Sequence, residues 1–261
     1  MTNEEWVRIC NDVAEAMRDH TRPFVTPLTA SSEHEVRLAG TGSYVDYRDR
    51  RVLLTCQHVQ EEGGVDFRFF GSNKVFKHSG PWAEDRRLSV DAAIASMGDA
   101  AWSATTHKAS AIPYERFAPA HQLAVPEELV FFRGFAGENA NYGFGEHQAS
   151  GTGYCSQEKQ GSISDPSIFE VLWEPQETRF TDETDPATRL AMKAQDPGGF
   201  SGSLVWNTRY LEHMAAGREW SPECAVVTGL LRRWDTATKT LLVWRVEHLR
   251  SWLGGINLKN L

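Results

Sequence analysis

The amino-acid sequence predicts an all-β protein, and two observations carry that prediction. Short apolar runs recur along the chain, each bounded by turn-forming residues, and little helical periodicity separates them. Many short strands joined by turns are typical of β-barrels and β-sandwiches rather than of parallel α/β sheets. The 261 residues, 41% hydrophobic and 24% charged, suffice for one large domain or two small ones with a buried core.

The first expected strands form a hairpin. Residues 40–47 are glycine-rich, residues 48–50 make a polar turn, and residues 51–55 are strongly apolar. The glycine-rich residues 134–145 lack a P-loop lysine, and we expect them to form a connecting loop. Further strands are expected at residues 65–70, 74–77 and 92–97 in the first half, and at 129–132, 150–155, 169–173, 189–194, 225–231 and 240–246 in the second.

Helical periodicity appears at both ends of the chain. Between residues 3 and 19, apolar side chains recur three and four positions apart, with acidic residues near the start. We expect this N-terminal helix to dock on the protein's own body. Residues 246–253 predict a short amphipathic helix that stops at Gly254. The polar stretches 174–187 and 208–223 are expected to be inserted loops.

The charge balance and the hydropathy pattern argue against several classes of partner. The formal net charge is −8 and no basic run is interleaved with aromatic residues, so nucleic acid is not an expected partner. No apolar stretch approaches the roughly 18 residues that span a bilayer, so no membrane partner is expected. The N-terminus lacks the basic and apolar regions of a secretory signal.

The cysteines and histidines give no sign of a metal or redox centre. Cys10, Cys56, Cys155 and Cys224 are widely separated and form no C-x-x-C pair, and we interpret Cys56 as a packing residue. Reduced thiols are the simplest interpretation, and they predict a cytoplasmic protein. The histidines lack H-x-x-H and H-E-x-x-H spacing, so we expect no metal site, and we expect no cofactor.

The clearest chemical signal runs from Asp196 to Val205. Gly199 and Gly202 flank Ser201 and carry no Cβ, so the backbone can turn sharply and a substrate can approach closely. In such a turn the N–H groups of Gly199 and Ser201 are expected to point at one oxygen atom, as an oxyanion hole does. An isolated Gly-x-Ser-Gly is more often a simple hairpin turn, so the interpretation depends on the rest of the chain.

Two further residues have the local context that a catalytic serine requires. His58 follows the apolar strand at residues 51–55, and Asp91 stands at the head of the strand at residues 92–97. Each alone is typical of a structural residue. With Ser201 they supply a nucleophile, a base that titrates near neutral pH, and a carboxylate that orients the base.

These ordered motifs resemble those of the trypsin-like (chymotrypsin-fold) serine proteases of the intracellular bacterial type. Leu54–Val59 resembles the family's L-T-x-x-H-V strand end, Asp91–Ala95 its D-x-A-[LV]-[LAV] aspartate, and Gly199–Val205 its G-x-S-G-[GS]-x-[LV] nucleophile turn. Gly40–Gly42 matches the glycine-rich strand before the histidine, and Val227–Leu231 resembles the strand that lines the substrate cleft. An α/β-hydrolase would require the order Ser, acid, His.

The resemblance implies two antiparallel Greek-key β-barrels packed face to face. Residues 1–24 would form an N-terminal helical extension, residues 25–118 the first barrel with the histidine and the aspartate, and residues 119–261 the second barrel with the serine and the C-terminal helix. The implied function is a serine endopeptidase that acts through a Ser-His-Asp triad and an acyl-enzyme. Its protein or peptide substrate would pair with an edge strand near residues 230–234.

Two departures from the family pattern bear on regulation. Zymogen-type members carry an aspartate directly before the nucleophile, whereas this chain has Phe200, so activation by that salt bridge is excluded. The cysteines of the secreted relatives' disulfides are missing, and Cys56 lies two residues before His58 rather than directly after it. We therefore expect a protease made in folded form and hypothesise that a regulatory protein partner, or access to the cleft, controls it.

The sequence leaves specificity and catalytic competence open. A basic pocket that prefers acidic side chains, a pocket floored by Asp196 that prefers basic ones, and a pocket narrowed by Trp234 are all compatible with it. A rival function is a catalytically silent scaffold of the same fold that binds peptides or partner proteins; loss of a triad member would be its sign, and none is lost. The residues expected to contact the substrate are Gln195, Asp196, Leu231, Arg232, Arg233 and Trp234.

Overall fold

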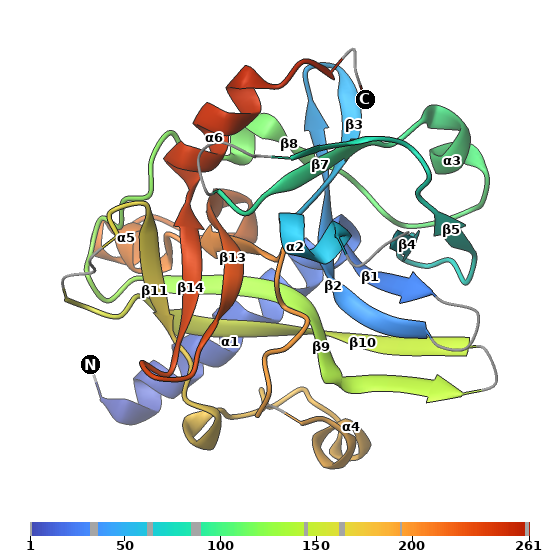
Figure 1. Ribbon diagram of the computed structural model, residues 1–261. Helices are drawn as coiled ribbons and strands as arrows, with labels where there is room; N and C mark the ends of the chain where they lie inside the picture. The colour runs from blue at the N-terminus through green and yellow to red at the C-terminus, as the bar shows by residue number, and fades with distance from the viewer. Residues whose placement is uncertain are drawn as a thin grey trace.

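Two curled antiparallel sheets make up most of the molecule, with a long N-terminal helix and a short C-terminal helix packed around them (Figure 1). The computed structural model describes residues 2–31, 36–61, 65–84, 90–143, 146–161, 165–193, 195–258 and 261. The arrangement confirms the all-β class and both terminal helices expected from the sequence. Among the described helices, none has the length and apolar character that crossing a bilayer requires.

The first sheet is built from the N-terminal half of the chain. Its order is β5-β4-β1-β2-β3-β7-β6, with the short β8 beside β2. All neighbours are antiparallel except β8 and β2, which run parallel. The strands are β1 (Val25–Ser31), β2 (Val36–Tyr47), β3 (Arg50–Thr55), β4 (Val65–Arg68), β5 (Val75–Lys77), β6 (Trp82–Glu84), β7 (Ala93–Ser96) and β8 (Ile112–Pro113).

The second sheet is built from the C-terminal half. Its order is β10-β9-β12-β13-β14-β11, and every pair is antiparallel. A bridge between Glu158 and Val171 brings the end of β10 back to β11, so the sheet curls toward a closed barrel. The strands are β9 (Leu129–Gly143), β10 (Glu146–Gln157), β11 (Ile168–Leu172), β12 (Leu204–Asn207), β13 (Val226–Asp235) and β14 (Thr240–Arg245).

The two sheets repeat one strand order. In the first, β4-β1-β2-β3 lie side by side; in the second, β12-β9-β10-β11 do so once the Glu158–Val171 bridge is included. Each set places a fourth strand beside the first of three consecutive ones, which is the Greek-key order. The implied pair of Greek-key sheets is therefore present, each curled into a half-barrel.

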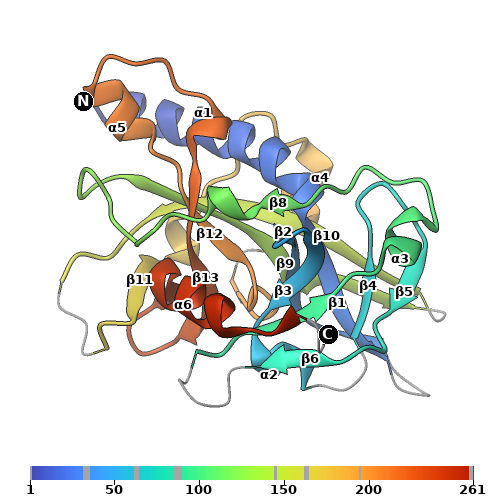
Figure 2. The same cartoon turned by 90° about the horizontal axis from the view of Figure 1, so that it is seen from above.

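Helix α1 (Asn3–Thr21) docks on the protein's own body, as its apolar stripe predicts. The Thr2 hydroxyl accepts the Glu5 N–H, and the Glu5 carboxylate accepts the Thr2 N–H, so a capping box begins the helix. Its stripe is buried at Ile9, Val13 and Met17. The helix lies against β9 and β10, which Figure 2 shows from above.

The other helical segments are short. The C-terminal α6 (Val246–Gly255) packs against β13 and β14. The polar stretch at 208–223, which was expected to be an insertion, holds two short helical segments. The remaining segments are α2 (Gln57–Gln60), α3 (Asp99–Ser103), α4 (Pro186–Ala191), α5 (Tyr210–Ala215) and the 3-10 turns η1 (Arg22–Phe24), η2 (Tyr114–Arg116), η3 (Pro175–Glu177) and η4 (Pro222–Cys224).

The expected loop at residues 134–145 is wrong, because β9 continues through Gly143 and pairs with β10; residues 144 and 145 lie outside the described ranges. The glycines serve close packing instead of a turn. A Cβ on Gly134 would lie 2.3 Å from the Ser203 hydroxyl, and one on Gly153 would lie 2.5 Å from the Phe131 ring. Glycine in a strand often marks such a close approach.

The expected strand at residues 189–194 is also wrong, because residues up to Ala191 belong to α4; Ala194 lies outside the described ranges. Pro186 stands in the first turn of α4, where its missing N–H costs nothing, and the Asp185 carboxylate accepts the Thr188 N–H. Leu190 is 90% exposed, so its apolar side chain does not mark a core strand. The helix start signal at Asp185 and Pro186 thus decides the local structure, and the short apolar run that follows does not form a strand.

A compact aromatic cluster lies directly behind the serine turn. Phe200 is fully buried, with its ring centroid 5.5 Å from Phe132, 5.3 Å from Tyr154 and 5.9 Å from Trp173. All three contacts are edge-to-face, which favours aromatic pairs beyond the area that they bury. The position that holds an aspartate in zymogen-type proteases therefore anchors the turn in the core.

We expect Phe200→Ala to lower the free energy of unfolding by about 3–5 kcal/mol, because it leaves a cavity inside this cluster. Urea denaturation measures the change. Leu190→Ala is the control and should leave stability within about 0.5 kcal/mol, because the side chain is exposed. A loss below about 1 kcal/mol for Phe200→Ala would contradict the packing described here.

Candidate active site

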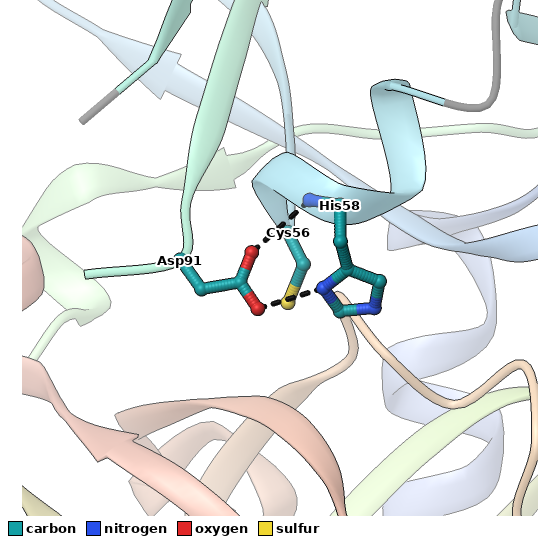
Figure 3. A group of neighbouring side chains, drawn as sticks. All are labelled: Cys56, His58 and Asp91. Carbon is teal, nitrogen blue, oxygen red and sulfur yellow. Dashed lines mark hydrogen bonds and ion pairs between the residues drawn. The ribbon is translucent and has the colours of Figure 1, made fainter. Parts of the chain in front are cut away.

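His58 and Asp91 form a paired side-chain unit on the first sheet (Figure 3). His58 lies on α2, directly after β3, and Asp91 lies just before β7, which pairs with β3. One Asp91 oxygen is 2.7 Å from His58 Nδ1, and the other accepts the His58 backbone N–H at 3.1 Å. The carboxylate thus fixes both the ring and the backbone of the histidine.

The environment of Asp91 favours its charged form. Burial raises the pKa of the carboxyl, but the hydrogen bonds and charge of His58, together with the nearby Arg232, outweigh burial and lower the pKa below its ordinary value. Arg232 Nε lies 3.6 Å from Asp91 Oδ2. Because an ionised carboxylate can only accept hydrogen bonds, His58 Nδ1 carries the proton of this bond and Nε2 is left as the basic nitrogen.

Ser201 lies at the centre of a tight turn before β12. The Phe200 N–H donates to the Pro197 carbonyl, and the Ser203 N–H donates to the Phe200 carbonyl. Gly202 has φ +89°, and a Cβ there would lie 2.1 Å from the Thr41 carbonyl oxygen. Only glycine fits this position, because both the backbone angle and the space exclude a side chain.

Two peptide units of this turn have a hydrogen-bonded carbonyl but an N–H group with no acceptor among the described residues. The Gly198 carbonyl accepts the Gly137 N–H at 2.7 Å, and the Phe200 carbonyl accepts the Ser203 N–H at 2.9 Å. A trans peptide is planar, so anchoring each carbonyl turns the N–H of the following residue the opposite way. Those N–H groups belong to Gly199 and Ser201, and neither has a hydrogen-bond acceptor among the described residues.

Thr41 of β2 joins the first sheet to this turn. Its N–H donates to the Ser201 carbonyl at 2.9 Å, and its hydroxyl donates to the Gly199 carbonyl at 2.9 Å. The same hydroxyl accepts the Phe135 N–H from β9 at 3.0 Å. One fully buried threonine thus satisfies three backbone groups of the second sheet and sets the turn against the His58–Asp91 unit.

The Ser201 hydroxyl does not bond to the histidine in this structure. It donates to the carbonyl oxygen of Arg232 at 2.8 Å, and the contacts of the described residues include no bond between Ser201 and His58. The His58 side chain is 45% exposed, so the imidazole is open to solvent. Ser201 and Asp91 both contact Arg232, the serine through the carbonyl oxygen and the aspartate through the guanidinium, so the serine hydroxyl is held on β13 close to the paired unit.

Beyond Leu231, no strand in the described part of the chain pairs with β13 on the side of the serine turn. Its pairing with β12 ends at Leu230, while its pairing with β14 continues through Asp235. The register shifts between Leu231 and Arg233, so Arg232 is an extra, unpaired residue of a β-bulge. Arg233 is exposed and Trp234 is partly buried, whereas the Leu231 side chain is buried in the core.

Gln195 and Asp196 are held by a residue that the sequence did not reveal. The N–H groups of both residues donate to the Glu138 carboxylate, at 2.8 and 3.0 Å. Asp196 in turn accepts the Gly198 N–H at 2.8 Å, so its carboxylate shapes the turn that leads to Gly199. Glu138 lies inside the range that the sequence suggested was a loop, and no motif marks it.

Among the residues that the structure describes, one group of side chains has the types that could hold a metal ion. A ligand atom from each of Cys56, His58 and Asp91 lies within 4.8 Å of the others (Figure 3). The fully buried Cys56 donates its thiol to the Leu231 carbonyl, and burial raises the pKa of that thiol well above its ordinary value. A protonated thiol is a poor metal ligand, so the group fits a packed thiol beside a His–Asp pair better than a zinc site.

No protein-family model and no curated protein sequence matches the chain. Solved structures do match nearly its whole length. The Rv3671c protease of M. tuberculosis in its active form is 16% identical, with a TM-score of 0.52, over 94% of this chain and 86% of that one. Neuropsin, a serine protease of mouse brain, is 11% identical with a TM-score of 0.51, over 90% and 94%. Human heparin binding protein is 10% identical with a TM-score of 0.53, over 92% and 93%.

At these identities the likeness concerns the fold. The chain has the chymotrypsin fold, with two curled antiparallel sheets, which confirms the fold that the sequence motifs implied. The roles of the individual site residues remain predictions from the sequence and from the geometry above.

We expect Thr41→Val to lower the free energy of unfolding by about 2–4 kcal/mol, because it removes the donor to the partly buried Gly199 carbonyl and leaves the buried Phe135 N–H unpaired. Thr41→Ser keeps the hydroxyl and should retain most of that stability. Urea denaturation of both variants measures the difference. Equal stability of the two variants would contradict the role given to the hydroxyl.

We expect the difference in stability between the native protein and Asp91→Asn to depend on pH. Because the pKa of Asp91 is lowered on folding, its charge contributes stability above the unfolded-state value of 3.8, and that contribution is lost as pH falls through the folded value. Urea denaturation between neutral pH and pH 3 measures the difference. A difference in the free energy of unfolding between the native protein and Asp91→Asn that stays constant with pH would contradict the expectation.

Proposed function

We propose that this protein is a serine endopeptidase in which Ser201 is the nucleophile, His58 the general base and Asp91 the residue that orients it. The observation that carries the proposal is the His58–Asp91 pair, joined at 2.7 Å beside a serine turn with two free N–H groups. The chymotrypsin fold supports it at the level of architecture. Under this proposal residues 25–118 supply the base and the carboxylate, and residues 119–261 supply the nucleophile.

The proposed reaction begins with transfer of the Ser201 hydroxyl proton to His58 Nε2. Asp91 keeps the other ring nitrogen protonated and stabilises the imidazolium that forms. The serine oxygen then attacks the scissile carbonyl, the imidazolium returns the proton to the leaving amine, and water hydrolyses the acyl-enzyme by the same steps. These reaction steps are supported by the hydrogen bond between His58 Nδ1 and the Asp91 carboxylate, whose pKa is lowered.

The N–H groups of Gly199 and Ser201 would stabilise the tetrahedral intermediate. Each well-placed donor of this kind contributes roughly 3–4 kcal/mol to transition-state stabilisation. The carbonyl groups of the same two peptide units, those of Gly198 and Phe200, are already hydrogen-bonded, so the N–H groups would need little reorganisation when the oxyanion forms.

We propose that the substrate is an extended peptide that adds to the free edge of β13. The residues that would line the site are those predicted from the sequence: Gln195, Asp196, Leu231, Arg232, Arg233 and Trp234. Because Leu231 is buried, it would contribute as core support rather than by contact with a substrate side chain. Backbone pairing with a strand edge is a common mode of peptide recognition.

We further propose that the free protein is in a resting state that an occupant of the cleft relieves. The Ser201 hydroxyl is hydrogen-bonded to the Arg232 carbonyl, which lies on the edge where the peptide would pair. A peptide N–H donated to that oxygen would compete with the hydroxyl and favour its rotation toward His58. A regulatory protein that occupies the same edge could act in the same way.

A catalytically silent, peptide-binding scaffold is the second candidate. The observation in its favour is the same hydrogen bond, because a serine held on Arg232 is not poised for proton transfer to His58. The ion-pair contact of Arg232 with Asp91 also reduces the negative charge available to an imidazolium. The two candidates differ in whether Ser201 is nucleophilic.

Labelling with a fluorophosphonate probe, followed by mass spectrometry, separates them. We expect the native protein to be labelled at Ser201, Ser201→Ala to be unlabelled, and His58→Ala to react at least about 100-fold more slowly, because it lacks the base. Ser203→Ala is the matched control: Ser203 is fully buried two residues away, and its loss should leave labelling intact. If folded native protein is not labelled in the presence of a peptide library, the scaffold is the correct function.

A further inference from the structure

The segment that leads into the serine turn is held by three consecutive residues of β9. Asn139, which is 9% exposed, exchanges two hydrogen bonds with the backbone of Lys193, each at 2.7 Å. The Gly137 N–H donates to the Gly198 carbonyl at 2.7 Å. Glu138, between them, carries the only charged side chain of the three. β9 therefore holds this segment at its two ends by uncharged bonds and in its middle by a carboxylate.

The Glu138 carboxylate holds the middle of the segment through a single oxygen atom. Oε1 accepts the Gln195 N–H at 2.8 Å and the Asp196 N–H at 3.0 Å. Hydrogen bonds to an ionised acceptor are stronger than those between neutral groups. Among the described residues, no lysine, arginine or histidine forms an ion pair with Glu138. Its hydrogen bonds there are therefore given entirely to the backbone of this segment.

Asp196 extends this hold to the next peptide units. Its carboxylate accepts the Gly198 N–H at 2.8 Å, while the Gly198 carbonyl accepts the Gly137 N–H. The peptide unit that joins Gly198 to Gly199 is thus fixed at its carbonyl and by the bond that precedes it. The same unit carries the Gly199 N–H, which is one of the two donors proposed for the oxyanion hole.

Hydrogen bonds are needed to fix this peptide unit, because both residues that it joins are glycines. Without a Cβ, neither residue meets the steric barriers that restrict backbone rotation elsewhere. Gly199 has φ +104°, an angle that other residues rarely adopt. If the unit turned over, its N–H would point where its carbonyl now points, because the two groups lie on opposite sides of one plane. The oxyanion hole would then lose a donor.

We propose that Glu138 is a positioning residue for the oxyanion hole. By holding the backbone of residues 195 and 196, it keeps the Gly198–Gly199 peptide unit in the orientation that presents its N–H to the oxyanion. This role rests on the proposed peptidase function, in which that donor stabilises the tetrahedral intermediate. Glu138 acts through the backbone and not by contact with the reacting atoms, so its removal should slow the chemical step and leave binding unchanged.

The kinetic test uses the fluorophosphonate probe. We expect Glu138→Ala to lower the maximal rate of labelling at Ser201 by about 10-fold or more, and to leave the probe concentration for half-maximal rate within about 2-fold. Glu138→Gln keeps an uncharged acceptor of the same shape, should recover part of the rate, and serves if Glu138→Ala does not fold. Glu127→Ala removes an equal charge from an exposed position before β9, so this matched control should change neither value.

Amide hydrogen exchange, followed by NMR, gives a measure that does not depend on activity. The Gly137 amide loses its acceptor if the Gly198–Gly199 unit turns over, whereas the Phe135 amide keeps its bond to the Thr41 hydroxyl. We expect Glu138→Ala to speed exchange at Gly137 by about 10-fold or more and to leave exchange at Phe135 unchanged. A general loss of stability would instead speed exchange at both amides.

Three results would overturn the proposal: an unchanged maximal rate of labelling in Glu138→Ala, unchanged exchange at Gly137, or equal acceleration at Gly137 and Phe135. Failure of the peptidase function is seen separately, as absence of labelling in the folded native protein. The exchange measurement then still decides whether Glu138 holds this peptide unit.

Discussion

The hydroxyl group of Thr41 is the contact on which the candidate site depends. It donates to the Gly199 carbonyl and accepts the Phe135 N–H, and the N–H of the same residue donates to the Ser201 carbonyl. Thr41 belongs to the first sheet and the other three belong to the second. The serine turn is therefore shaped by its own glycines but positioned by the opposite sheet, where the His58–Asp91 pair also resides. The other link between the serine and this pair runs through Arg232, whose carbonyl accepts the Ser201 hydroxyl and whose guanidinium lies beside Asp91.

The parts of the fold that depend on local signals could be predicted from the sequence, and those that depend on distant neighbours could not. The capping residues and apolar stripe of α1, and the glycines around Ser201, are local sequence signals that suffice to predict the helix and the turn. By contrast, β1 was not among the strands predicted from the sequence, and it contains Pro27. Pro27 lies opposite Thr41, whose N–H is donated to Ser201 instead of to β1, so no ladder bond is lost there. The register of β1 against β2 places the proline at a non-hydrogen-bonded pair, and that register is set by residues outside the local sequence.

The same distinction holds within the candidate site. The three residue types and their order predict a nucleophile, a base and an acid. The hydrogen bond that the serine makes, however, depends on the bulge in β13. That bulge frees the Arg232 carbonyl from pairing with β14 and leaves it to accept the Ser201 hydroxyl, while the side chain of the same residue lies beside Asp91. The irregularity in the strand arises from how two strands align, and no single stretch of sequence encodes it. Arg232 therefore contacts both Ser201, through its carbonyl oxygen, and Asp91, through its side chain.

The docking of α1 has a consequence for how the chain is made. The helix is synthesised well before its partners β9 and β10, which end about 130 residues later. At the usual pace of translation this interval lasts on the order of ten seconds. Throughout it the stripe formed by Ile9, Val13 and Met17 stays uncovered. The nascent chain therefore exposes an apolar helix face until the second sheet forms and covers it.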